Sequence, residues 1–230
     1  MRIENADTHG IFCYEVKNRF RCIVEVEGDE KLCYVASSCR LSNFLELEGK
    51  EVLLLPKGKN ASSTYYTLYA VKYRNSYILL ELSLANNVIR EQIHRRYFSL
   101  LGKRKNVVSE KLICGYKADL FIHDTNTIIE IKTVISSHDE TMFPTVYSDR
   151  SLVQLDKVKA LLRSGYKFCY MFVALSPAIK QIIINKDTFF YRKFVECMDC
   201  GMQVTACRLR TTERNVEVDR MIEVKMPESI

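Results

Sequence analysis

Short segments rich in Val, Ile, Leu, Phe and Tyr recur through the first third of the chain between polar turns, a pattern typical of β-strands. Strands are expected near residues 11–26, 31–36, 51–55, 64–73 and 77–82, with one helical turn at 42–48. Short polar or glycine-containing turns such as Gly28-Asp29 and Gly49-Lys50 separate them. Five strands with a helical connection of this kind predict an OB-like β-barrel over residues 1–82, a fold often used to grip single-stranded nucleic acid.

The period of the apolar residues changes near Ser83. Ile89, Ile93 and Tyr97 recur at helical spacing, and this helix is expected to run to about residue 101. The remaining elements are expected as a strand at 107–114, a hairpin at 118–132, a loop at 136–147, a helix at 149–164, strands at 167–175 and 179–184, a helix from 187 to 200 and a strand at 202–209. This order predicts a mixed α/β domain over residues 83–230, and an α+β fold for the whole chain.

The hairpin gathers two carboxylates and one amine. If its turn centres on Thr125-Asn126, Asp119 lies opposite Lys132, and Glu130 shares their face because side chains alternate with period two. Carboxylate oxygens are the ligands that Mg²⁺ prefers, so Asp119 and Glu130 could bind Mg²⁺ or Mn²⁺. The lysine could orient or help deprotonate the water that attacks a phosphodiester. The plain alternative is a surface ion-pair cluster.

The helix expected at 149–164 brings three polar side chains to one face. Arg150, Gln154 and Lys157 are spaced i, i+4 and i+7. If that face looks onto the hairpin, they could bind the scissile phosphate. An ordinary solvent-exposed helix face is the alternative, and it has most weight for Lys157.

Charge permits a polyanionic partner without requiring one. The net charge is +6 over 230 residues. The stretch from Asn86 to Asp119 is more basic than the rest, with eight basic and three acidic residues. Arg95 and Arg96 in this stretch could therefore steer a phosphate backbone towards the hairpin, although a basic helix face is more often simply solvated.

Cysteine content and hydropathy bear on location. Nine cysteines, an odd number, favour reduced thiols over a disulfide framework. Cys197 and Cys200 form one CxxC pair, but neither a second pair nor a suitably spaced histidine completes a zinc site. The first ten residues are polar, and no apolar run reaches the roughly 18 residues of a membrane span. We therefore expect a cytoplasmic protein without a membrane partner, and a homodimer is compatible with the sequence.

These segments resemble the sugar fermentation stimulation protein family, whose members join an OB-like domain to a restriction-endonuclease-like domain of the PD-(D/E)xK superfamily. The likeness runs from residue 20 to 224, and its closest passages are Ser109-Glu110, 118–122, 129–134, Phe143-Pro144, Arg150 and 172–176. The resemblance implies that Asp119 and Glu130 are metal ligands and that Lys132 is the catalytic lysine. Glu110 matches a family acid that could complete the metal site or bind a second ion, or it is an ordinary exposed strand residue.

Two segments depart from the family pattern. Residues 35–41 stand where the family has Cys-Pro-Asn-Thr-Gly-Arg-Met, and Arg40 alone is unchanged, so it is kept as a candidate substrate contact. Gln154 stands where the family has histidine. These changes spare the carboxylates and the lysine and fall on segments that would contact substrate.

Two functions follow from these residues. The first is a metal-dependent nuclease that hydrolyses phosphodiester bonds of DNA or RNA, with binding supplied by the barrel and the basic helix. The alternative is a non-catalytic DNA-binding protein with a regulatory role in sugar metabolism, as the family's name implies. The alternative predicts salt-sensitive binding that persists in EDTA without cleavage.

Overall fold

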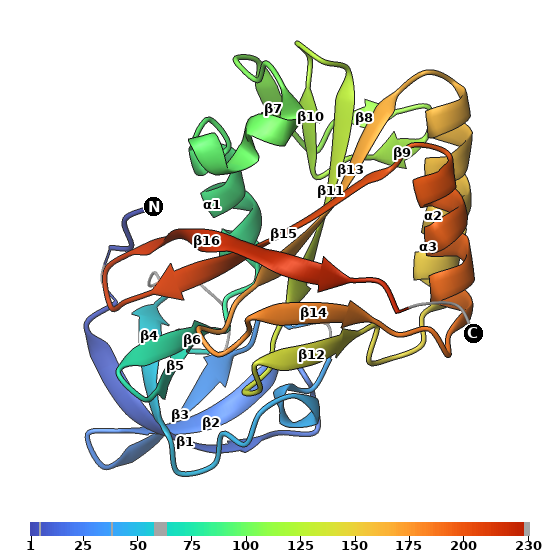
Figure 1. Cartoon of the computed structure of the whole chain (residues 1–230). Coiled ribbons are helices and arrows are strands. Elements are labelled where there is room, and N and C mark those ends of the chain that lie inside the picture. The colour runs from blue at the N-terminus through green and yellow to red at the C-terminus, as the bar shows by residue number, and fades with distance from the viewer. Residues whose placement is uncertain (5, 38, 58–63, 228–230) are drawn as a thin grey trace.

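Strands β1 to β5 form a closed barrel from the N-terminal part of the chain, coloured blue to cyan in Figure 1. The structure is a computed structural model that describes all residues except 5, 38, 58–63 and 228–230. β1 pairs with β2 and β4, and a parallel pair between β3 and β5 closes the ring. The strands are Thr8–Glu15, Arg21–Val26, Asp29–Tyr34, Glu51–Pro56 and Tyr66–Tyr73. The predicted OB-like barrel is confirmed, and the short helix η1 (Leu41–Asn43) overlaps the first two residues of the predicted helical turn at 42–48.

The segment 11–26, expected as one strand, is two strands joined by a tight turn. The backbone N–H of Val16 donates to Arg21 O at 3.2 Å, and that of Arg21 donates to Asn18 O at 2.9 Å. The Asn18 side chain also accepts a hydrogen bond from the backbone of Phe20 at 3.1 Å. The single-strand prediction was wrong because apolar composition does not locate a turn that is built by local side-chain bonds.

The sheet continues from the barrel into the α/β part of the chain. β6 (Ser76–Leu79) pairs with both β5 and β15 (Gln203–Thr211), and the order from there is β15-β13-β11-β10-β7. β11, β13 and β15 are parallel, whereas β10 and β7 are antiparallel to their neighbours. The bounds are Val107–Ser109 for β7, Leu120–Ile122 for β10, Thr127–Val134 for β11 and Lys167–Ala174 for β13.

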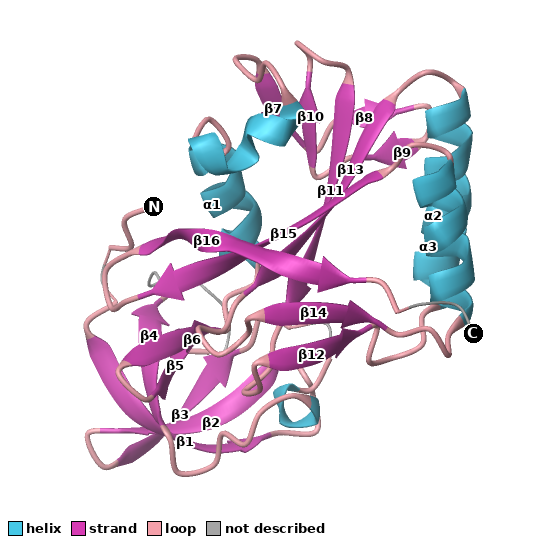
Figure 2. Ribbon diagram, in the orientation of Figure 1, coloured by secondary structure: helices cyan, strands magenta, loops and turns pink. Residues whose placement is uncertain are grey.

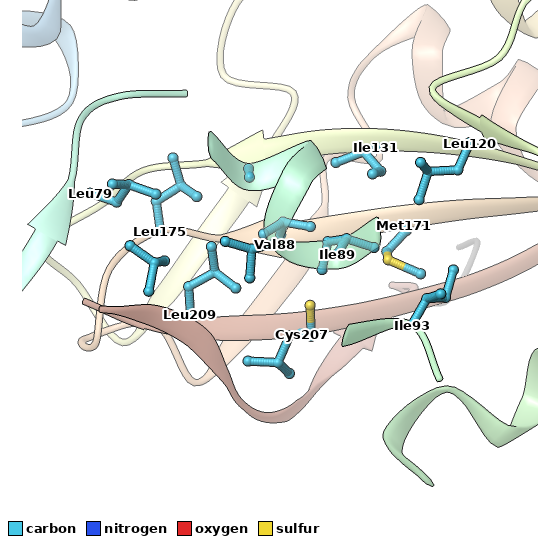
Figure 3. Packing of buried hydrophobic residues seen from close by; sticks show 14 of the residues in the cluster. Leu79, Val88, Ile89, Ile93, Leu120, Ile131, Met171, Leu175, Cys207 and Leu209 are labelled. Atoms are coloured by element: carbon cyan, nitrogen blue, oxygen red, sulfur yellow. The ribbon is translucent and has the colours of Figure 1, made fainter. Parts of the chain in front are cut away.

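Helices cover both faces of this sheet (Figure 2). α1 (Ser83–Gln92) packs on one face, and α2 (Asp149–Arg163) and α3 (Phe189–Asp199) pack together on the other. Val88 and Ile89 of α1 share a core with residues of the barrel and of the α/β strands (Figure 3). The barrel and the α/β part are therefore joined by a common apolar core as well as by the sheet.

Two expected elements are interrupted. The helix expected to reach about residue 101 stops at Gln92, and the 3-10 helix η2 (Arg96–Leu101) follows after an extended residue, Arg95. The strand expected over 107–114 breaks at Glu110, where a φ of +54° turns the chain. A separate hairpin of β8 (Leu112–Ile113) and β9 (Tyr116–Lys117) replaces its second half.

The sequence does not predict strands β12 and β16. β12 (Glu140–Phe143) lies inside the expected loop and pairs with β14 (Gln181–Ile184). β16 (Val216–Lys225) pairs with both β14 and β15. Within the described residues, no helix is long and apolar enough to cross a membrane. The cytoplasmic location and the homodimer stay predictions.

Candidate active site

The β10–β11 hairpin places the charged cluster, with a register that differs from the expected one. Leu120 pairs with Ile129 and Ile122 with Thr127, so the position opposite Asp119 is Glu130 and not Lys132. The register prediction was wrong by two residues because the connection between the strands is a four-residue loop, 123–126, that centres one position earlier. A shift of two preserves the faces, so Glu130 and Lys132 still share one face of β11.

Glu130 lies in a closed ring of hydrogen bonds. Its side chain is 6% exposed, and its Oε2 accepts a hydrogen bond from the Tyr116 hydroxyl at 2.6 Å. Its Oε1 accepts from Lys132 Nζ at 2.6 Å, and the same ammonium donates to Gln154 Oε1 at 3.0 Å. Gln154 Nε2 donates to the Tyr116 hydroxyl at 3.0 Å, which closes the ring. The carboxylate and the lysine are thus held in one geometry by β9, β11 and α2.

Asp119 stands beside this ring at the start of β10. Its Oδ2 accepts a hydrogen bond from the backbone N–H of Ile131 at 2.7 Å, and its Oδ1 accepts from Asn86 Nδ2 of α1 at 3.3 Å. Burial, with the charge of Glu130 as the second cause, raises the pKa of Asp119 to about 6. The backbone bond and the Lys132 charge act in the opposite direction. The Asp119 and Glu130 carboxylates therefore repel each other at a site that is partly shielded from solvent.

The donor set fits a hard divalent cation. Asp119 and Glu130 supply carboxylate oxygens close enough for the charge of one to raise the pKa of the other, a repulsion that a cation would relieve. No three His, Cys, Asp or Glu side chains of the described chain are grouped to hold a metal ion. A cation here would thus have two protein carboxylates and would complete its shell with water or phosphate oxygens, which is the usual manner of Mg²⁺.

Of the three polar residues of α2, Gln154 contacts the β10–β11 hairpin, through its hydrogen bond with Lys132, whereas Arg150 and Lys157 lie towards β9. Arg150, Gln154 and Lys157 line one open hollow of about 410 Å³ together with Tyr116 and Lys117. We call this the basic hollow. Gln154 and Tyr116 line the basic hollow and also belong to the ring around Glu130, so these two side chains separate the hollow from the carboxylates.

The other predicted site residues lie elsewhere. The exposed Glu110 side chain is bound to Lys117 Nζ at 2.8 Å, although its backbone N–H donates to Asp119 O. Arg40 is exposed on the barrel, where its guanidinium donates to Lys17 O at 3.3 Å.

Arg95 and Arg96 follow the C-terminal end of α1, which packs on the face of the sheet opposite α2. The hydrogen bonds of Asp119 and Glu130 among the described residues involve neither arginine side chain, and the role of Arg95 and Arg96 in steering phosphates stays a prediction. The sequence shows that residues 86–119 are rich in basic side chains, but it does not show on which face of the sheet these side chains lie.

Two residues that contact the carboxylates, Tyr116 and Asn86, were not predicted from the sequence. Tyr116 reads as one more apolar position after Gly115, and its contact with Glu130 depends on the β8–β9 hairpin, which periodicity does not reveal. Asn86 lies inside α1 and donates to Asp119. The sequence offered one indication for Tyr116 and Asn86, namely that each has a polar group near apolar residues.

Comparisons with known proteins agree with this architecture. Residues 16–80 match the family model of the SfsA N-terminal OB domain, and residues 83–215 match that of the sugar fermentation stimulation protein RE domain. A sugar fermentation stimulation protein homolog of Desulfitobacterium hafniense (strain DSM 10664 / DCB-2) is 24% identical over 216 residues, covering 92% of this chain and 93% of that protein. A homolog of Caldanaerobacter subterraneus is 25% identical over 229 residues, covering 97% and 99%.

A solved structure has the same fold. Pyrococcus furiosus SfsA in complex with Ca²⁺ superposes with a TM-score of 0.81, covering 98% of this chain and 99% of that one. The sequence identity is 17%, so the likeness concerns the fold.

Proposed function

The chain belongs to the sugar fermentation stimulation protein family, and we propose that it is a metal-dependent nuclease that hydrolyses phosphodiester bonds of DNA or RNA. The observation that carries this proposal is the cluster of Asp119, Glu130 and Lys132, with two crowded carboxylates and an ammonium held rigidly beside an open basic hollow. A protein that only bound polyanions would gain little from buried carboxylates in that position.

Each residue then has a role. Asp119 and Glu130 would bind Mg²⁺ or Mn²⁺, which when bound polarises the phosphate and lowers the pKa of water. Lys132, fixed by Glu130 and Gln154, would orient the attacking water or stabilise the charge that develops on the phosphate. Arg150 and Lys157 would hold the phosphates on either side of the bond being cut.

Two further observations support the proposal. The Pyrococcus furiosus relative was solved with Ca²⁺, a hard cation that also prefers oxygen ligands. The N-terminal OB domain belongs to a fold that commonly binds nucleic acid.

The test is incubation of the purified protein with labelled single- and double-stranded DNA and RNA in Mg²⁺, Mn²⁺ or EDTA. We expect cleavage of at least one polymer in Mg²⁺ or Mn²⁺, and none in EDTA or by Glu130→Ala. Retained, salt-sensitive binding without cleavage in either metal would contradict the nuclease and favour the DNA-binding alternative with a regulatory role.

A further inference from the structure

A second depression lies on the other side of α2's first turn from the basic hollow. It has a volume of about 370 Å³ and runs between the end of β11, β12, the loop 144–148 and the barrel segment that contains Phe44. Phe44, which directly follows η1 of the barrel, and Met142 of β12 line this depression together, and Figure 2 shows η1 below the first part of β12. We call this depression the apolar cleft.

The apolar cleft exposes large side chains to solvent. Met142 is 45% exposed, Val146 50% and Tyr147 66%. Neighbouring exposed apolar residues of this size mark a binding surface more often than scattered ones do. The Tyr147 hydroxyl donates to Asp149 Oδ1 at 2.5 Å, which ties the ring to the first turn of α2 at the edge of the cleft.

The apolar cleft and the basic hollow differ in chemistry, and each is lined by residues close in the chain to the cluster of Asp119, Glu130 and Lys132 or bonded to it. Arg150 lines the basic hollow, whereas Ser151, the next residue, lines the cleft. Val134, two residues beyond Lys132 on β11 and therefore on the same face of the strand, also lines the cleft. A strand that lays its phosphates against the basic hollow would therefore meet an apolar, aromatic surface one step past the cluster. Charge in the hollow favours a polyanion over an apolar protein segment as the occupant.

We propose that the apolar cleft takes an unstacked nucleobase of the strand being cut, so that the substrate is single-stranded nucleic acid or an unpaired end. The inference rests on the proposed function. A duplex keeps its bases stacked inside and presents only backbone and groove edges, whereas a single strand can place a base face against Tyr147. Every base can stack on an aromatic ring, so the cleft would distinguish single from double strands and would not distinguish one sequence from another.

The test is fluorescence anisotropy in EDTA, where nothing is cut. Three short labelled ligands are compared: a single strand, its duplex, and the same strand with abasic sites in place of the bases, in DNA and in RNA. We expect the wild type to bind one of the single strands at least about fivefold tighter than the matching duplex. The affinity of Tyr147→Ala for that single strand should be about tenfold lower, and its affinity for the other two ligands should not change. Tyr147→Phe keeps the ring and should bind like the wild type.

The control is Tyr97→Ala, which removes an exposed tyrosine of η2 (43% exposed), outside the lining of both the cleft and the hollow. It should leave all affinities unchanged. If Tyr147→Ala binds all three ligands as tightly as the wild type, or loses the same affinity for each of them, the proposed base pocket is wrong, whereas the proposed nuclease activity is unaffected. A wild type that binds none of the ligands would overturn both. A change in sedimenting mass in Tyr147→Ala without a change in affinity would assign the cleft to contact between copies of the chain and overturn the base pocket.

Discussion

Glu130 is a buried carboxylate whose two oxygens each accept one short hydrogen bond. Burying a charge is costly unless it is paired, and here Lys132 and the Tyr116 hydroxyl provide the pairing. The same bonds fix the carboxylate before any ligand arrives. The hydrogen bonds that stabilise the buried Glu130 carboxylate also hold the Lys132 ammonium in one position.

Removing the Tyr116 hydroxyl should therefore destabilise the protein. In Tyr116→Phe, Glu130 Oε2 loses its donor and Gln154 Nε2 loses its acceptor in a largely buried place. We expect a loss of about 2 kcal/mol in the free energy of unfolding, measured by urea denaturation. Tyr147→Phe, which removes an exposed hydroxyl, should change it by less than about 0.5 kcal/mol. Equal stabilities of the two variants would show that the ring does not hold Glu130.

The crowding of the carboxylates should appear in the pH dependence of stability. Burial and the charge of Glu130 raise the pKa of Asp119 to about 6, so the folded protein keeps this proton to a higher pH than the unfolded chain. Stability should fall as pH rises from about 4 to about 6. Asp119→Asn removes this titration. In EDTA we expect the variant to be more stable than the wild type at pH 8, by on the order of 2 kcal/mol, and no more stable below pH 4.

Thermal melts of both proteins across this pH range make the measurement, with Asp187→Asn, at an exposed position, as the control. A difference between wild type and Asp119→Asn that does not change with pH would contradict the crowding of Asp119 and Glu130.

At the scale of elements, sequence pattern was enough for strands and helices with strong local signals. The helix at Asp149–Arg163 and the strand at Lys167–Ala174 were predicted to within two residues. β12, with four residues, is positioned by pairing with β14, about forty residues further along the chain. The hairpin register depended on a four-residue loop whose centre the sequence did not specify. Local periodicity therefore found the cluster, whereas long-range pairing decided which residues complete it.

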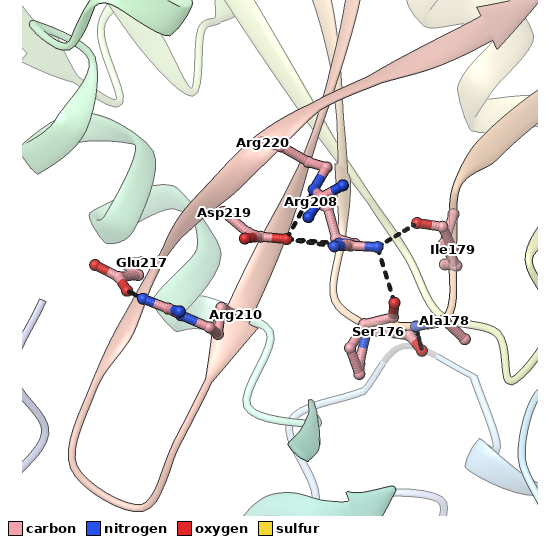
Figure 4. Close-up of polar contacts among 9 residues, drawn as sticks. Ser176, Ala178, Ile179, Arg208, Arg210, Glu217, Asp219 and Arg220 are labelled. Carbon is pink, nitrogen blue, oxygen red and sulfur yellow. Dashed lines mark hydrogen bonds and ion pairs between the residues drawn. The ribbon is translucent and has the colours of Figure 1, made fainter. Parts of the chain in front are cut away.

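The β15–β16 ribbon is anchored to the loop after β13 by one arginine (Figure 4). The Arg208 side chain is 12% exposed, pairs with Asp219 of β16 and donates to Ile179 O at 3.5 Å and Pro177 O at 2.9 Å. Arg208→Ala leaves a half-buried carboxylate and two carbonyls without this donor. We expect it to lower the free energy of unfolding by about 3 kcal/mol, measured by urea denaturation.

Arg210→Ala is the matched control on the same strand. Its guanidinium is 60% exposed and pairs with Glu217, so its loss should cost less than about 1 kcal/mol. Similar losses for the two variants would mean that the bonds from Arg208 to the loop contribute little.

At the scale of the whole molecule, the barrel and the α/β part share strands and a core. Leu79 of β6 donates its backbone N–H to Leu175 O at 3.0 Å, and both side chains lie in the core that α1 covers. The apolar cleft has walls from both parts, so this joint fixes the two walls relative to each other. The barrel thus contributes one wall of the cleft in which we propose that a nucleobase binds.

In the proposed mechanism Lys132 acts in phosphodiester cleavage at a two-carboxylate metal site. The most direct test is the single-turnover rate of cleavage in Mn²⁺ by the wild type, Lys132→Met and Lys159→Met. Lys159 is a fair control because it is 29% exposed and pairs with Glu196 at 2.7 Å, whereas Lys132 is 25% exposed and pairs with Glu130 at 2.6 Å. We expect Lys132→Met to be slower by about 100-fold or more and Lys159→Met to match the wild type. Equal rates for all three proteins would contradict a catalytic role for Lys132.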